Sequence, residues 1–178
     1  MDREFNLLFP LDRFYAQAAL PLPAVSRVPA EEVPDPYGSL LVGQHDMTPT
    51  LEAFHGEPIH LRLIDRKLDG DALLRMVVLA LDDSAKPVEF GAIRISLPLF
   101  PPEARERILE GWTPLGTILA TYHVEHASRP QAFVRVVSDS LIEEVLCLNG
   151  QDVLYGRRNV LLTPQGGVLA DILEILPP

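Results

Sequence analysis

The longest apolar stretch of the chain, residues 73–96, predicts two neighbouring strands joined by a polar turn at residues 82–87. Each strand carries one arginine among its apolar residues, Arg75 in the first and Arg94 in the second. If Leu81 faces Val88 across the turn, Arg75 faces Arg94, and a slip of two residues keeps both on one face of the sheet. The pattern therefore predicts that the two arginines share a face.

A guanidinium buried without a partner costs several kcal/mol, more than the burial of a neighbouring valine returns. Two such groups over an apolar floor would bind a small ligand that carries carboxylates. The alternative is that each arginine reaches a sheet edge or pairs with an Asp or Glu, and the spacing allows both.

The rest of the pattern predicts about six strands and four helices, with local hairpins and no alternation of strand and helix. This arrangement favours an α+β domain with a mainly antiparallel sheet and helices packed against it. We expect one domain over residues 1–178, in which the proline-rich residues 1–34 form an arm packed on a core of residues 35–178. The further strands are expected near residues 59–66, 132–137, 153–163 and 168–176, and the helices near 48–56, 101–111, 113–122 and 140–149.

Charge and composition narrow the class of protein. The chain has 15 basic and 25 acidic residues, a net charge of −10, which argues against nucleic acid or an anionic membrane as a partner. Cys147 is the single cysteine, so no internal disulfide can form. No apolar run approaches the ~20 residues of a membrane span, and the N-terminus lacks a signal pattern. We expect a cytoplasmic protein.

Three groups of polar residues are candidates for chemistry. His123 and His126 are spaced to share one helix face, but no third ligand accompanies them, so we expect no metal site. Arg157 and its neighbour Arg158 must face opposite sides of a strand. The alternative to a role in a site is that this strand is an exposed edge, where the two arginines form salt bridges. Asp171 and Glu174, three residues apart in the last strand, also lie on opposite faces. One of these acids would enter the interior and neutralise an arginine or transfer a proton, and the spacing does not say which.

Several motifs occur in one order along residues 35–178. They are Asp46-Met47-Thr48 before a short helix, residues 56–63 leading into a strand, Leu74-Arg75, Gly111 with Thr113-Pro114-Leu115-Gly116, and Gly156-Arg157-Arg158 before an acidic hairpin. In this order they resemble the chorismate lyase family, also called chorismate pyruvate-lyase or 4-hydroxybenzoate synthase. The segment between Gly116 and Gly156 is longer than is typical of that family.

The resemblance implies a six-stranded antiparallel sheet whose helices enclose a pocket. It also implies a lyase that converts chorismate to 4-hydroxybenzoate and pyruvate without a cofactor, as in ubiquinone biosynthesis. On this basis Arg75 would hold the ring carboxylate, with Met47 and Leu115 closing around it, and Arg94 would match a second arginine of the family. The catalytic acid would be Glu174, or Asp171 if the gap in the last hairpin is placed differently.

Two other functions remain open beside the lyase. A related chorismatase would release a different hydroxybenzoate isomer. A non-enzymatic domain of the UTRA type would bind small aromatic carboxylates as part of a transcription regulator. Residues 1–45 are too proline-rich to supply the helix-turn-helix that such a regulator carries.

Overall fold

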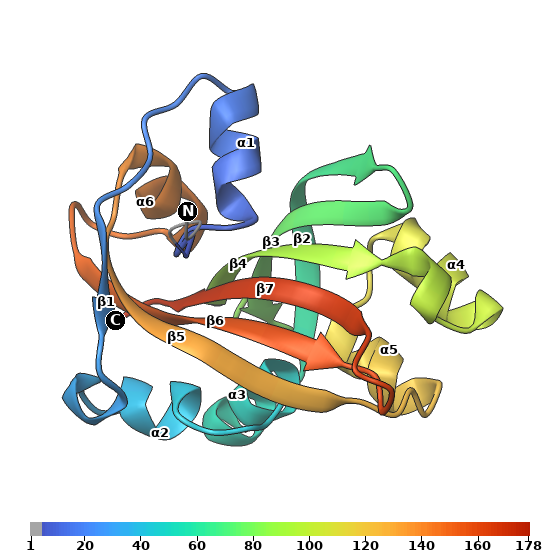
Figure 1. Ribbon diagram of the computed structural model, residues 1–178. Helices are drawn as coiled ribbons and strands as arrows, with labels where there is room; N and C mark the ends of the chain where they lie inside the picture. Colours follow the sequence, from blue (N-terminus) through green and yellow to red (C-terminus); the bar gives the residue numbers. More distant parts are fainter. Residues whose placement is uncertain (1–4) are drawn as a thin grey trace.

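The computed structural model describes residues 5–178, which form one antiparallel sheet covered by helices on both faces (Figure 1). The strands follow the order β1-β5-β6-β7-β4-β3-β2 across the sheet. Their bounds are β1 Val25–Val28, β2 Ile59–Asp69, β3 Ala72–Leu81, β4 Pro87–Ser96, β5 Ala127–Val137, β6 Val153–Leu162 and β7 Val168–Leu176. The predicted α+β class is confirmed.

Helices α1 and α6 pack on one face of the sheet, and the other helices cover the opposite face and its end (Figure 1). The buried apolar residues form one cluster under α1 and α6 and two on the opposite face, because side chains of a strand alternate between the faces. The bounds are α1 Leu11–Gln17, α2 Tyr37–Leu41, α3 Met47–His55, α4 Pro102–Glu110, α5 Leu115–Thr121 and α6 Ser140–Leu146, with 3-10 turns at Ala30–Glu32 and Leu97–Leu99.

The sheet has seven strands where six were expected. The additional strand is β1, which pairs antiparallel with β5 through Val25 opposite Val136. It has only four residues, two of them polar, and lies in the proline-rich segment, so its sequence carries no strand pattern. Helices α1 and α2, seven and five residues long, lie in the same N-terminal region and were missed for the same reason.

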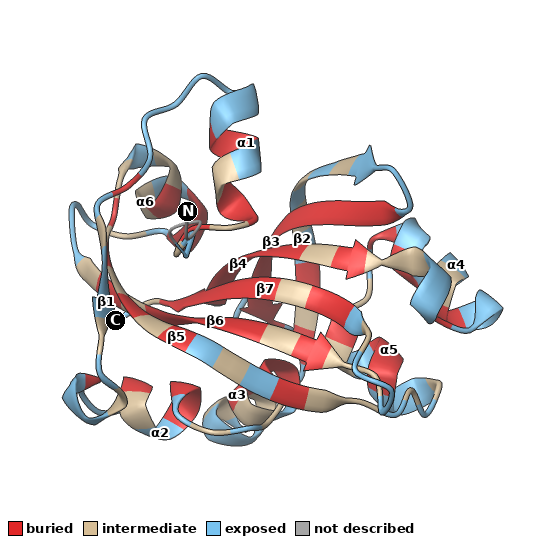
Figure 2. Cartoon of the chain, viewed as in Figure 1, coloured by how far each residue is buried: buried red, intermediate tan, exposed pale blue. Residues whose placement is uncertain are grey.

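The centre of the sheet is closed to solvent on both sides. All ten residues of β3 are buried, as Figure 2 shows along the whole strand. A polar side chain on β3 therefore enters a protein interior whichever face it points to.

None of the helices formed by residues 5–178 has both the length and the apolarity that a membrane crossing requires.

A β-bulge shifts the pairing of β3 with β4 away from the predicted register. Ala80 pairs with Pro87 near the turn, but the next pair is Leu79 with Glu89, so Val88 is an extra residue in β4. An extra residue reverses the alternation of every side chain beyond it.

The prediction that Arg75 and Arg94 share a face is therefore wrong. Beyond the bulge Arg75 pairs with Ile93, whereas Arg94 pairs with Leu74 on one side and Asp171 on the other. Paired residues point to the same face of a sheet, so Arg75 and Arg94 point to opposite faces.

Candidate ligand-binding pocket

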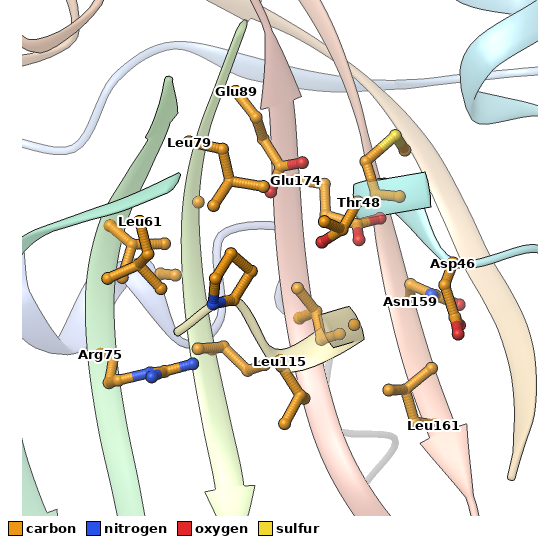
Figure 3. Close-up of a pocket in the computed structure, with 18 of the residues that line it drawn as sticks. Asp46, Thr48, Leu61, Arg75, Leu79, Glu89, Leu115, Asn159, Leu161 and Glu174 are labelled. Carbon is orange, nitrogen blue, oxygen red and sulfur yellow. The ribbon is translucent and has the colours of Figure 1, made fainter. Parts of the chain in front are cut away.

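A pocket lies between the sheet and the first turns of helices α3 and α5 (Figure 3). Its cavity volume of about 60 Å³ suits a small ligand rather than a nucleotide or a peptide. Strands β2, β3, β4, β6 and β7 all contribute to its floor. Its walls include Asp46, Met47, Thr48, Pro114, Leu115 and Gly116, and its floor includes Leu61, Arg75, Val77, Leu79, Glu89, Gly91, Ile93, Asn159, Leu161, Ile172 and Glu174.

The two helices that form the roof can approach closely because one residue lacks a side chain. A Cβ at Gly116 in the first turn of α5 would lie 2.9 Å from Thr48 Oγ1 in the first turn of α3. Real Cβ atoms do not approach that closely, so only glycine fits at this position. Met47 and Leu115 are both buried beside this contact and meet the pocket.

Arg75 supplies positive charge from the floor of the pocket. Its side chain is 1% exposed, and within residues 5–178 its Nε and Nη1 have no hydrogen-bond partner. Burial, with a smaller contribution from the charge of Arg66, lowers the pKa of Arg75 to about 10, so the guanidinium stays charged at neutral pH. An anion is the partner that this group lacks.

Glu89 projects into the opposite end of the same floor (Figure 3). Its side chain is buried, and its Oε2 has no hydrogen-bond partner in the described part of the chain. Burial and the nearby carboxylate of Glu174 raise the pKa of Glu89 well above its ordinary value, although the charge of Arg157 opposes the rise. Burial therefore favours the neutral carboxylic acid over the carboxylate at this position.

Glu174, beside Glu89 in Figure 3, is held by an ion pair. Arg157 Nε donates a hydrogen bond to Glu174 Oε2, and both side chains are buried. The same guanidinium donates to the carbonyl oxygens of Leu41 and Gly43, each at 3.2 Å, and of His45 at 2.8 Å. Arg157 thus ties the acid to the segment that leads into helix α3.

The second arginine–acid pair lies on the other face of the sheet. Arg158 Nη2 donates to Asp171 Oδ1, and Arg94 is paired in register with Asp171. The predictions that Arg157 and Arg158, and likewise Asp171 and Glu174, face opposite sides are both confirmed. The edge-strand alternative for β6 is wrong, because β6 lies between β5 and β7.

The structure brings together four of the six predicted site residues. Met47, Arg75, Leu115 and Glu174 line the pocket, whereas Arg94 and Asp171 do not. Sequence analysis missed Glu89. A signal was present, since apolar residues flank Glu89 on both sides along β4 and indicate a strand buried on both faces, where no exposed position exists for an acid.

The histidines near the pocket make hydrogen bonds rather than a metal site. His126 Nε2 lies 2.8 Å from Asp46 Oδ2 at the edge of the pocket, and His126 Nδ1 lies 2.8 Å from the carbonyl oxygen of Val124. Over residues 5–178, no three His, Cys, Asp or Glu side chains gather as metal ligands would.

Comparison with known proteins identifies the fold but no family. No family model and no curated protein sequence matches the chain. The effector domain of PhnF from Mycobacterium smegmatis is similar in structure, with a TM-score of 0.57 at 11% identity over 76% of this chain and 90% of that one. A gene product of Staphylococcus aureus, SA0254, gives a TM-score of 0.52 at 9% identity over 67% and 82%.

A second structure of PhnF gives a TM-score of 0.56 at 10% identity, again over 76% of this chain. The chain spans 65% of the length of that PhnF chain. At these identities the likeness shows the fold alone. The fold is the chorismate lyase-like one, and the effector domain of PhnF shares it.

Proposed function

We propose that this chain is a ligand-binding domain for a small molecule with one carboxylate, which Arg75 holds in the pocket. The observation that carries the proposal is the state of Arg75, which is 1% exposed and has two guanidinium nitrogens without a partner within residues 5–178. A buried cation without a partner costs several kcal/mol, and a bound carboxylate offsets that cost with charge-assisted hydrogen bonds.

The charges of the pocket floor favour a ligand with a single carboxylate. Arg157 already pairs with Glu174, and burial disfavours the charged form of Glu89. Arg75 is then the cation that a ligand has to neutralise. A dicarboxylate such as chorismate would place its second charge near Glu174 without a second cation, because Arg94 points to the other face of the sheet.

The likeness to the PhnF effector domain supports a function in ligand binding rather than in catalysis. It is a likeness of fold at 11% identity, so it does not name the ligand. We infer only that a pocket of this kind, on this fold, suits the recognition of a small effector.

A chorismate lyase is the second candidate, and one observation favours it. Four of the six residues that the resemblance assigned to the reaction line one pocket, namely Met47, Arg75, Leu115 and Glu174. Two observations stand against it. Arg94 lies outside the pocket, and Glu174 is already engaged by Arg157.

The first test is calorimetric titration of the pure protein with 4-hydroxybenzoate, chosen as a small aromatic monocarboxylate. We expect Arg75→Gln to weaken binding about 100-fold, since loss of one partner of a buried charge pair costs 2–5 kcal/mol. Arg135→Gln is the matched control, because Arg135 is a half-buried strand arginine outside the pocket. Equal affinity of wild type and Arg75→Gln would contradict the proposal.

The second test separates the two candidates. The protein is incubated with chorismate, and the products are followed by chromatography. If the protein is a binding domain, chorismate is expected to decay at its uncatalysed rate. Equimolar 4-hydroxybenzoate and pyruvate, formed in proportion to enzyme concentration, would establish the lyase instead.

A further inference from the structure

We infer that Glu89 is a specificity-determining residue, whose carboxylic acid donates a hydrogen bond from Oε2 to an uncharged oxygen of the ligand, at the end opposite Arg75. The inference rests on the proposed function and extends it. It defines the ligand class as an apolar body with a carboxylate at one end and a hydroxyl or carbonyl oxygen at the other.

The β-bulge is what brings Glu89 into the pocket. If Val88 paired with Leu79 and continued the register near the turn, Glu89 would pair with Val78 and point to the face that carries Phe90 and Ala92 now. The bulge exchanges the two faces of β4. It removes Arg94 from the pocket side and places Glu89 there.

The position of Glu89 suits contact with the far end of a ligand. Arg75 and Leu79 are four residues apart on β3, and Glu89 pairs with Leu79, so the backbones of Arg75 and Glu89 are separated by about 13 Å at 3.3 Å per residue. Both side chains extend from this floor into the pocket (Figure 3). Hydrogen bonds of about 2.8 Å at each end would leave roughly 7 Å of that backbone separation for the ligand, about the length of one ring with its substituents.

Gly91 keeps that space open. It lies between Glu89 and Ile93 on β4, and a Cβ at this position would come within 3.2 Å of Glu89 Oε1 and 3.0 Å of the carbonyl oxygen of Leu173. Any side chain here would fill the floor and push against the acid. The glycine leaves a surface on which an apolar ligand body can lie.

The groups around Glu89 leave its Oε2 hydrogen without a protein acceptor. The charged groups that face it are Glu174 from β7 and Arg157 from β6, which pair with each other. Leu79 approaches it from β3, and the pocket face of α3 contributes Met47 and Thr48. Among residues 5–178, Glu89 Oε2 has no hydrogen-bond partner, although an unpaired buried polar atom costs about 1–3 kcal/mol.

The experiment compares 4-hydroxybenzoate with benzoate, which lacks only the far oxygen. We expect wild type to bind 4-hydroxybenzoate about tenfold more tightly, because the hydroxyl satisfies the buried acid. Glu89→Gln, whose amide also donates, is expected to keep most of this preference. Glu89→Leu is expected to bind the two compounds equally. Glu144→Gln, at an exposed position of α6, is the control.

Two outcomes would overturn the inference, and they are distinguishable. A preference that persists in Glu89→Leu would remove the role of Glu89 and leave the proposed function intact. A wild type that binds neither compound would contradict both the role of Glu89 and the proposed function.

Terephthalate provides a test on the wild type that does not depend on how a variant folds. Its second carboxylate would face Glu89 and Glu174, so we expect it to bind at least tenfold more weakly than 4-hydroxybenzoate, and equal binding would again contradict the inference.

Discussion

Burial acts on Arg75 and Glu89 in the pocket floor, but with different results for their charge. The pKa of Arg75 falls only to about 10, so it remains a cation at neutral pH. Burial raises the pKa of Glu89 well above its ordinary value of 4.5, which favours the neutral acid over the carboxylate. The floor therefore offers an anion site at one end and a hydrogen-bond donor at the other, although both groups would be charged in water.

Replacing Glu89 with glutamine is expected to stabilise the fold by an amount that grows with pH. The unfolded carboxyl ionises at its ordinary value of 4.5, whereas the folded one keeps its proton to higher pH. The stability that depends on this proton is complete below pH 4.5 and is lost as pH rises through the folded pKa. Relative to Glu89→Gln, wild type should lose about 1.4 kcal/mol per pH unit in that window.

Urea unfolding of wild type and Glu89→Gln at several values from about pH 5 to pH 8 measures this difference. The exposed Glu144→Gln variant should show no such trend with pH. A difference between wild type and Glu89→Gln that is constant with pH would mean that Glu89 ionises normally in the folded protein.

At the scale of strands and helices, the bulge in β4 decides which side chains form the site. Alternation in the sequence predicted both strands of the hairpin and the positions of most other elements. It could not fix the register, because residues on both faces of β4 are apolar. Phe90 and Ala92 on one face look no different from Gly91 and Ile93 on the other, so a one-residue shift leaves the pattern equally satisfied.

Other parts of the site could be predicted because local chemistry marks them. Pro114 precedes helix α5 and Gly56 ends helix α3 with a φ of 68°, a left-handed conformation that favours glycine. The helix ends that carry Met47 and Leu115 were therefore placed correctly to within about two residues, as boundaries usually are. The hydrogen bonds that Arg157 makes to residues 41–45 involve backbone carbonyls, which no sequence pattern reveals.

Gly91→Ala tests whether the bare backbone of β4 is needed for ligand binding. The added methyl group would meet Glu89 Oε1 at 3.2 Å and the Leu173 carbonyl oxygen at 3.0 Å. We expect a loss of stability of about 1–3 kcal/mol and at least a tenfold loss of affinity for 4-hydroxybenzoate. Calorimetry and urea unfolding measure the two effects.

Gly167→Ala is the matched control for this variant. Gly167 lies in the turn between β6 and β7, where a Cβ would meet Thr163 Oγ1 at 3.2 Å, a contact as tight but remote from the pocket. It should lose stability without losing affinity. If Gly91→Ala binds 4-hydroxybenzoate as wild type does, the ligand does not lie on that part of the floor.

At the scale of the whole molecule, the sheet separates two interiors, the buried layers on its two faces, which have different functions. The face under α1 and α6 is a continuous apolar cluster that includes Leu11, Phe14 and Phe90. The face under α3 and α5 has two clusters, and the pocket lies where they meet. The first interior adds stability, whereas the second leaves space and polar groups for a ligand. This division implies that stability and binding can be changed separately.

A pair of Leu→Ala variants tests this division. Leu11 on α1 and Leu51 on α3 are both buried, at 0% and 1% exposure, on opposite faces of the sheet. Each truncation should cost about 2–5 kcal/mol, which for a chain of this length lowers the melting temperature by about 5–15 °C. Only Leu51→Ala should also weaken the binding of 4-hydroxybenzoate, because α3 positions Met47 and Thr48 at the pocket. An equal loss of affinity in Leu11→Ala, measured well below its melting temperature, would show that the sheet transmits changes from one face to the other. The two interiors would then not be independent, and α1 would have to be counted among the elements that shape the pocket.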